Sequence, residues 1–338
     1  MVQNEEERLR KERTFRERST ALDLLTDREL IERYRFPRQG ILSLADLVKE
    51  DIQRPTARCH AIPPFLQVMV TLRFLAKGDF LSETADIHGV SKASASRCVE
   101  EVTSSICKRL QNIKLPRGNA EIDAVKEGFY KIGGFPNVVG TVDGTLIPIQ
   151  RPHEDEPAYV CRKGLPAINV QAIANSDLRF SNAVVRWPGS THDSFMLTNS
   201  SVPAYMEQIQ NSWLLGDSGY PLKKWLMTPL LNTANEQEVR FNTAHCKTRN
   251  VIERSFGVLK SRFRCLHKTG GHLPYKPPKS VKIISSCFKL HNKCIDDGVP
   301  LLNIEDGGNE VEIEHHIDMP ANHNRDAQTI RQRLINRF

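Results

Sequence analysis

The sequence predicts an α/β protein in which a mixed β-sheet is flanked by helices and follows an all-α N-terminal module. Residues 1 to about 130 carry helical periodicity with few strand signals. Between about 135 and 220 the apolar residues alternate with period 2, and helical periodicity returns after about 244. A chain of 338 residues can bury a core of this kind without disulfides or metals. We therefore expect a helical domain at 1–133, an α/β domain at 134–300, and a linker with a C-terminal helix at 301–338.

The N-terminal segment is divided into helices by prolines at 55, 63, 64 and 116. Within it, the stretch FLSETADIHGVSKASASRCVEEV predicts a helix, a turn at Gly89 and a second helix capped by Ser91. A helix-turn-helix places the start of its second helix in the DNA major groove, where Lys92 and Arg97 would reach phosphates. The same geometry occurs in folds that do not contact DNA, so both uses stay open.

Three strand-like runs follow, with the sequences VVGTVDGTLIPIQ, INVQAIA and LRFSNAVVRW. Residues 175–177 (Asn, Ser, Asp) lie between the last two runs and suit a tight turn, so we expect an antiparallel meander. A helical stretch begins at Asp193. The later run WLLGD is short, continuously apolar and ends at Asp217, which is typical of a strand that is buried on both faces and parallel to its neighbour. We expect this strand beside the first one.

Two helices close the α/β segment. Ile252, Phe256, Leu259 and Phe263 recur at helical spacing and predict a helix over 244–262, after a loop rich in Pro, Asn and Thr. A second helix is expected over roughly 279–295. Beyond it, residues 301–319 contain acids but no Lys or Arg, which predicts a solvated linker. The final stretch RDAQTIRQRLINRF can form a helix that docks back onto the domain.

The charge of the chain is unevenly distributed. Lys and Arg number 47 against 40 Asp and Glu, a net charge of +7, and 39% hydrophobic with 26% charged residues excludes a fully disordered chain. Residues 240–268 hold eight Lys and Arg residues and a single acid, Glu253. The net charge of this segment, +7, therefore equals that of the whole chain. Both a solvated helix face and a surface for a polyanion such as nucleic acid fit this segment.

Cysteine use and hydropathy indicate the compartment. The eight cysteines form no CxxC pair and no apolar leader precedes them, so we expect a reduced, intracellular environment. The most apolar stretch, PPFLQVMVTLRFLAKG, is interrupted by Gln67, Thr71 and Arg73 and falls short of the ~20 apolar residues of a membrane span. We expect a core helix there, and no membrane partner.

Four acids lie where predicted elements begin or end. Asp143 lies within the first strand, Asp217 ends the strand expected beside it, Glu253 lies on the helix over 244–262, and Asp193 opens the helix after the third strand. Converging carboxylates repel unless cations lie between them, and two hard divalent ions about 3.5–4 Å apart can drive phosphodiester cleavage. The pattern therefore indicates metal-assisted phosphoryl transfer. Taken singly, each acid also fits a structural use, as a turn residue, a helix N-cap or a solvated helix acid.

Six strings between about 137 and 295 carry a family resemblance: VDGTLIPI, YVCRKGLPAINVQAI, WPGSTHDSF, LLGDSGYPLKKWLMTP, FNTAHCKTRNVIERSFGVLKSRF and LHN. In this order they resemble the PIF/Harbinger transposase family of DDE superfamily endonucleases. The resemblance implies that the mixed sheet of 134–300 has an RNase H-like fold. It also implies that Asp143, Asp217 and Glu253 are catalytic acids that bind Mg²⁺ or Mn²⁺, with Asp193 as a further metal ligand.

The same resemblance implies an activity, partners and a location. The expected activity is that of a metal-dependent DNA endonuclease, whose phosphate contacts would be Arg162, Lys163, Arg249, Arg254 and Lys260. In the family, a separate Myb-like protein recognises DNA and assists nuclear import, so we expect such a partner and a distribution between nucleus and cytoplasm. A homo-oligomer is compatible with this scheme. The alternative is a domesticated transposase that binds DNA or a partner without cleaving.

Overall fold

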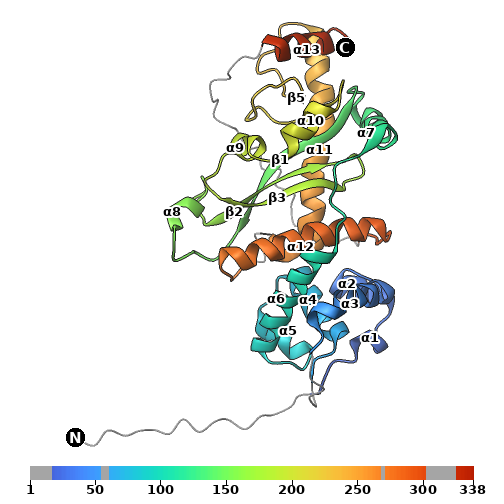
Figure 1. The fold of residues 1–338 in the computed structure, drawn as a ribbon, viewed down its shortest axis with the longest axis vertical. Coiled ribbons are helices and arrows are strands. Elements are labelled where there is room, and N and C mark those ends of the chain that lie inside the picture. Colours follow the sequence, from blue (N-terminus) through green and yellow to red (C-terminus); the bar gives the residue numbers. More distant parts are fainter. Residues whose placement is uncertain (1–16, 55–60, 268–270, 302–324) are drawn as a thin grey trace, which may run out of the picture.

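A five-stranded mixed sheet forms the centre of the molecule in the computed structural model, which describes residues 17–54, 61–267, 271–301 and 325–338 (Figure 1). β1 pairs antiparallel with β2, and β2 with β3, whereas β4 runs parallel to both β1 and β5. The predicted meander, the parallel strand beside the first one and the RNase H-like class of mixed sheet are therefore confirmed. The strands lie in the order β3-β2-β1-β4-β5 and span β1 Val138–Pro148, β2 Ala167–Ala174, β3 Phe180–Pro188, β4 Trp213–Leu215 and β5 Leu226–Met227.

The sheet separates two apolar cores, and helices cover both of its faces. On one face, which we call the α11 face, Val170 and Ala172 of β2 share a core with α11 (Glu236–Arg262) and α12 (Pro277–Asp296). On the opposite face, the α9 face, Val142 and Ile173 pack with α9 (Asp193–Thr198), α10 (Val202–Gln208) and one residue of α7 (Gly118–Gly133). Successive side chains of a strand point to opposite faces, so the face of each residue of β1 follows from its position.

The N-terminal helices form a group at one end of the molecule (Figure 1). Gly89, in the turn between α5 and α6, has φ 63°, and a Cβ there would lie 2.0 Å from the carbonyl oxygen of Glu17. The Ser91 hydroxyl accepts a hydrogen bond from the backbone N–H of Ser94 (3.1 Å) and so caps α6. The predicted order of a helix, a turn at Gly89 and a second helix capped by Ser91 is confirmed. Its contact with DNA stays a prediction. The helices are α1 Ala21–Leu24, α2 Asp27–Tyr34, α3 Arg38–Ile52, α4 Pro64–Lys77, α5 Leu81–Ile87 and α6 Lys92–Arg109.

Arg35 joins this group of helices to the end of α11. Its Nε donates to the carbonyl of Arg262 (2.8 Å), and its two terminal nitrogens donate to the carbonyls of Glu32 (2.9 Å) and Ala76 (3.3 Å). These carbonyls belong to the last turns of α11, α2 and α4, where no partner is available within the helix. Because one apolar core also runs from Leu30 through α12, the boundary at residue 133 stays a prediction.

Helix α11 begins earlier than the sequence predicts. The expected start at 244 is wrong by about two turns, because the Asn235 side chain accepts a hydrogen bond from the Glu238 N–H (2.9 Å) and caps the helix at Glu236. Acids in the first turn favour this start through the helix dipole. Two short helices complete the domain, α8 (Glu156–Tyr159) in the β1–β2 connection and the 3₁₀ helix η1 (Arg264–Leu266) after α11.

Helix α13 (Arg325–Ile335) docks back onto the N-terminal part of α11, as expected. Asp326 pairs with Lys224 at 2.6 Å, and the Phe338 ring lies 5.6 Å from that of Phe135 and 5.9 Å from that of Phe241. The predicted acidic linker falls almost entirely on residues outside the described ranges. Across the described part of the chain, no helix has both the length and the apolar character needed to cross a membrane.

Candidate active site

Asp143 lies within β1, and Asp217 lies two residues beyond the end of β4, the parallel strand beside it. β1 and β4 pair at Thr141 and Leu215, and the two acids follow two residues later on each chain segment. Backbone N–H groups orient both carboxylates, because Gly144 donates to Asp143 Oδ1 (2.8 Å) and Gly219 donates to Asp217 Oδ1 (3.1 Å). The strand order thus brings these two acids together, as predicted.

Glu253 approaches from α11 and reaches Asp143 through a cation. Arg249, one turn earlier on α11, donates from Nη1 to Asp143 Oδ2 (3.2 Å) and from Nη2 to Glu253 Oε1 (2.5 Å). The side chains of Asp143 and Arg249 are 18% and 20% exposed, and that of Glu253 is 36% exposed. The pair of acids from β1 and α11 is therefore linked by a mostly buried guanidinium on the α11 face of the sheet.

Asp193 lies on the other side of β1. A Cβ on Gly144 would lie 2.5 Å from both carboxylate oxygens of Asp193, so this carboxylate occupies the space of the missing side chain. Since Gly144 follows Asp143 along the strand, its side-chain position points to the α9 face. Asn169 holds the Asp193 carboxylate there with a hydrogen bond of 2.8 Å. Asp193 is thus near the other acids without sharing their face.

Burial and the negative charges of neighbouring acids raise the pKa values of Asp143 and Tyr220. Burial raises the pKa of Asp143 to about 8, and the negative charges of Asp217 and Asp193 add to the rise while Arg249 opposes it. Burial also raises the pKa of Tyr220 well above its usual range, helped by the charges of Asp193, Asp143 and Asp217. The carboxylates of such a site repel one another, and a bound divalent cation would offset this repulsion.

The donor set fits a hard divalent cation in its chemistry but is not closed around one. Carboxylate oxygens are the ligands that Mg²⁺ and Mn²⁺ accept. Nevertheless, within the described ranges no three His, Cys, Asp or Glu side chains are grouped so that they could hold a metal ion. Arg249 stands between Asp143 and Glu253, and Asp193 faces the other way. The assignment of Asp143, Asp193, Asp217 and Glu253 as metal ligands stays a prediction.

The bases predicted to contact DNA lie in two places. Arg254 is exposed and Lys260 half-buried on α11 beyond Glu253. Arg162 and Lys163 are exposed in the loop between α8 and β2. This loop lies past the end of β1 at Pro148, which is about 17 Å along the strand from Asp143. Arg249, by contrast, contacts the acids themselves. The DNA contacts stay predictions.

The basic segment of 240–268 exposes less charge than its composition indicates. Arg262 is 7% exposed and donates to the carbonyl of Val299 (3.0 Å). Arg240 pairs with Glu236 at 3.7 Å near the start of α11, and Lys268 lies outside the described ranges. The bases of α11 that are both near the acids and at the surface are consequently fewer than the sequence predicts.

Sequence reasoning missed the polar residues that hold Asp193. Gln171 donates to the Asp193 backbone carbonyl (2.8 Å) and lies 2.9 Å from the Tyr220 hydroxyl, while Asn169 binds the carboxylate. Asn169 and Gln171 are buried and point to the α9 face. A signal was available, because two alternate polar residues interrupt the apolar run AINVQAIA.

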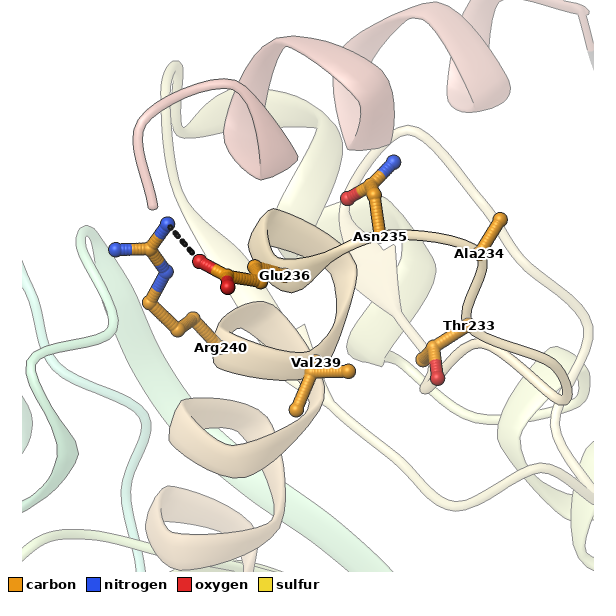
Figure 2. A pocket seen from close by; sticks show the side chains of 6 residues that line it. All are labelled: Thr233, Ala234, Asn235, Glu236, Val239 and Arg240. Atoms are coloured by element: carbon orange, nitrogen blue, oxygen red, sulfur yellow. Dashed lines mark ion pairs between the residues drawn. The ribbon is translucent and has the colours of Figure 1, made fainter.

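A separate pocket lies at the start of α11, away from the acids. Figure 2 shows its lining side chains and the ion pair between Arg240 and Glu236. Val239, which lines it, is 14 residues before Glu253, or about 21 Å along the helix axis. This pocket is therefore not part of the candidate active site. Its lining consists of residues 233–236, 239 and 240.

Comparison with known families identifies the class of protein. A family described as DDE superfamily endonuclease matches residues 142–292, the stretch that contains all four acids. The RNase H-like sheet and the acids on β1, after β4 and on α11 are consistent with this class. No solved structure matches the chain significantly.

Individual relatives cover most of the chain. Putative nuclease HARBI1 of Homo sapiens is 39% identical over 322 residues, which are 93% of this chain and 91% of the human protein. The protein of the same name in Xenopus laevis is 34% identical with the same coverage. Protein ALP1-like of Arabidopsis thaliana is 27% identical over 68% of this chain and 60% of its own length. The chain therefore belongs to the DDE superfamily endonucleases, in the Harbinger-derived group that includes Putative nuclease HARBI1.

Proposed function

We propose that this protein is a metal-dependent DNA endonuclease of the DDE type, which hydrolyses phosphodiester bonds by a two-metal mechanism and leaves a 3′-hydroxyl. One observation carries the proposal: Asp143 of β1 and Asp217, just beyond β4, each follow the paired residues Thr141 and Leu215 by two positions, and Arg249 links Glu253 of α11 to Asp143. The near full-length similarity to proteins named Putative nuclease HARBI1 supports it.

In this proposal Asp143, Asp217 and Glu253 hold the divalent cations, and Asp193 is a further ligand. The bound cations supply Lewis acidity, which stabilises charge on the scissile phosphate and makes the attacking water more acidic. The protein contributes orientation: the N–H groups of Gly144 and Gly219 fix two of the carboxylates.

The bases position the substrate in this scheme. Arg254 and Lys260 extend from the acids along α11, and Arg162 with Lys163 lies at the end of the β1–β2 hairpin. Cations at these two places would bind phosphates on the DNA backbone near the scissile bond, without reading the sequence. Sequence recognition is left to other parts, of which the α5–α6 helix-turn-helix is one.

Nicking of DNA by the purified chain in Mg²⁺ or Mn²⁺ tests the proposal. Asp143→Asn, Asp217→Asn and Glu253→Gln are each expected to lower the rate by roughly 100-fold or more, because each removes a charge that stabilises the transition state. Glu236→Gln is the matched control, since Glu236 is also paired with an arginine on α11 but is 94% exposed and far from the acids. Equal nicking by the wild type and all three acid variants would exclude this active site.

The competing function is DNA or partner binding without cleavage. The nicking assay distinguishes the two functions when it is repeated with the Myb-like partner added. That partner is expected to deliver the chain to its DNA target and to assist nuclear import. DNA binding with no nicking under these conditions would favour the binding function. Nicking that appears only with the partner would support both the endonuclease and the partnership.

The predicted distribution between nucleus and cytoplasm belongs to this partnership. We expect the chain to be mainly cytoplasmic when expressed without the Myb-like protein and to become nuclear when the two are co-expressed. Microscopy of a fluorescently tagged chain measures this, and nuclear accumulation that is independent of the partner would contradict it.

A further inference from the structure

Arg249 is placed differently from an ordinary basic residue on a helix surface. Its guanidinium reaches carboxylates on two separate elements, Asp143 Oδ2 of β1 at 3.2 Å and Glu253 Oε1 of its own helix. Long cationic side chains usually extend their charged ends into water. Here the side chain is only 20% exposed and is directed to the sheet.

The surroundings explain why a cation is held at this point. Asp217, two residues beyond β4, and Asp193, on the opposite face of β1, both place negative charge near the mostly buried Asp143. Like charges in such a place repel strongly unless a positive charge lies between them. A guanidinium carries that charge on a planar fork, which can bind two carboxylates at once.

We propose that Arg249 is a built-in counter-ion, which holds the carboxylates of Asp143 and Glu253 in the metal-free protein and is displaced when a divalent cation binds. The inference rests on the proposed function, since it concerns the same acids. It assigns Arg249 a positioning role that precedes any contact with DNA. Once displaced, its guanidinium remains one turn from Glu253 and is available for a substrate phosphate.

The proposal predicts that removing Arg249 lowers the stability of the metal-free protein but raises its affinity for the metal. Without the guanidinium, the metal-free protein loses the charge that offsets its acids and becomes less stable. The same loss removes a competitor for the carboxylates and a repulsion against the incoming cation, so the metal binds more tightly. A residue that only supported the fold would weaken metal binding when removed, because the ligands would lose their positions.

Metal binding to the full chain without DNA tests this directly. Mn²⁺ is titrated into metal-stripped wild type and Arg249→Gln, with isothermal calorimetry or the Mn²⁺ electron paramagnetic resonance signal as the readout. Arg249→Gln is expected to bind Mn²⁺ about tenfold more tightly or better, since loss of a unit charge at contact distance is worth at least that factor. Its metal-free Tm is expected to be lower than that of the wild type, and the rise in Tm on adding Mn²⁺ larger.

Two further variants complete the experiment. Arg240→Gln removes a paired arginine from the same helix at a distance from the acids, and should leave Mn²⁺ affinity unchanged. Arg249→Lys keeps the charge but not the fork, so its Mn²⁺ affinity should fall between those of wild type and Arg249→Gln. Arg249→Lys also serves as the test if Arg249→Gln does not fold.

The outcomes separate this inference from the proposed function. Suppose that the wild type binds Mn²⁺ and nicks DNA, but both Arg249 variants bind Mn²⁺ equally well or more weakly. This result overturns the displacement of Arg249 and leaves the proposed endonuclease activity intact. Absence of Mn²⁺ binding in every variant overturns both. Tight binding by Arg249→Gln with weak binding by wild type supports the counter-ion.

Discussion

Gly144 is the residue on which the separation of the acids depends. Its neighbour Asp143 points to the α11 face, and the absence of a side chain at Gly144 admits the Asp193 carboxylate on the α9 face. One residue of strand thus divides the acids into two groups. The Asn169 amide fixes the second group at a hydrogen-bond distance of 2.8 Å.

Gly144→Ala is expected to displace Asp193, because the new Cβ would lie 2.5 Å from its carboxylate oxygens. Such overpacking costs roughly 1–3 kcal/mol of unfolding free energy. Urea denaturation measures this loss, and the nicking assay should show a fall in rate similar to that of Asp193→Asn. An alanine variant with unchanged stability and activity would show that Asp193 has no fixed place against the strand.

Two buried histidines predict a loss of stability in mild acid. Burial lowers the pKa of His245 and of His291 to about 4, and each ring donates from Nε2 to a backbone carbonyl, of Met227 and Leu178 respectively. The folded-state pKa lies below the ordinary value of about 6.5, so the unfolded chain takes up protons first as the pH falls. Stability that is complete above pH 6.5 is therefore lost progressively towards pH 4.

The expected loss is roughly 1–2 kcal/mol for each histidine at pH 5 relative to pH 7.5. Urea denaturation at several pH values measures it. His245→Gln keeps a donor for the Met227 carbonyl but cannot be charged, so its stability should change less with pH. The exposed His153 is the control, and His153→Gln should follow the wild-type curve.

At the scale of elements, α11 does the most to assemble the site. It spans 27 residues, begins after the N-cap Asn235 and contacts α13 near its start. Arg249 lies at its midpoint and Glu253 lies one turn later. Its interior also contains Gly257, exposed and one turn after Glu253, where an added Cβ would meet nothing within 4 Å. Glycine in a helix interior costs stability, and packing within the protein does not explain this one.

Gly257→Ala is expected to raise the unfolding free energy by about 0.5–1 kcal/mol, because alanine reduces the entropy of the unfolded chain and no neighbour opposes it. Thermal or urea denaturation measures the gain. The contrast with Gly144→Ala is informative, since the same chemical change should have the opposite sign at the two positions. A loss of stability at Gly257 would mean that α11 is bent or packed differently there.

The sequence predicts the helices and strands better than it predicts the tertiary contacts between them. Alternation predicts the meander, a continuous apolar run predicts the parallel strand before Asp217, and helical spacing predicts the helix that carries Glu253, because local burial patterns determine all three. They do not predict β5, whose two residues are too short for a pattern, or the start of α11, where one cap overrides the composition. The position of Arg249 between two acids depends on tertiary distances, which spacing along the chain does not contain.

For the whole molecule, the N-terminal helices and the sheet domain are joined by more than apolar contact. Arg35 donates to carbonyls at the ends of three helices, which belong to both parts. Its side chain is buried, and burial lowers its pKa to about 10, so it stays charged at neutral pH. This guanidinium is a specific connection between the helix-turn-helix end and the sheet end.

Arg35→Met is expected to destabilise the whole molecule by roughly 2–4 kcal/mol, since two buried carbonyls and a partly buried one lose their donor. Urea denaturation followed by both tryptophan fluorescence and far-UV circular dichroism measures the effect. If Arg35 couples the two parts, the variant should also show separate transitions by the two probes. The exposed neighbour Arg33 provides the control, and Arg33→Met should change stability by less than about 0.5 kcal/mol.

The length of α11 has a geometric consequence for the proposed reaction. The helix is about 40 Å long, with Glu253 in its second half and Arg262 bound to Arg35 at its end. The nine-residue step from Glu253 to Arg262 is a rigid spacer of about 14 Å between the acids and the point where Arg35 attaches the N-terminal helices. A straight helix does not stretch, so the distance between Glu253 and Arg262 is fixed. For the proposed endonuclease, this fixed distance predicts that a DNA sequence bound by the N-terminal helices lies at a constant offset from the cut, and that the offset depends on the number of residues in α11.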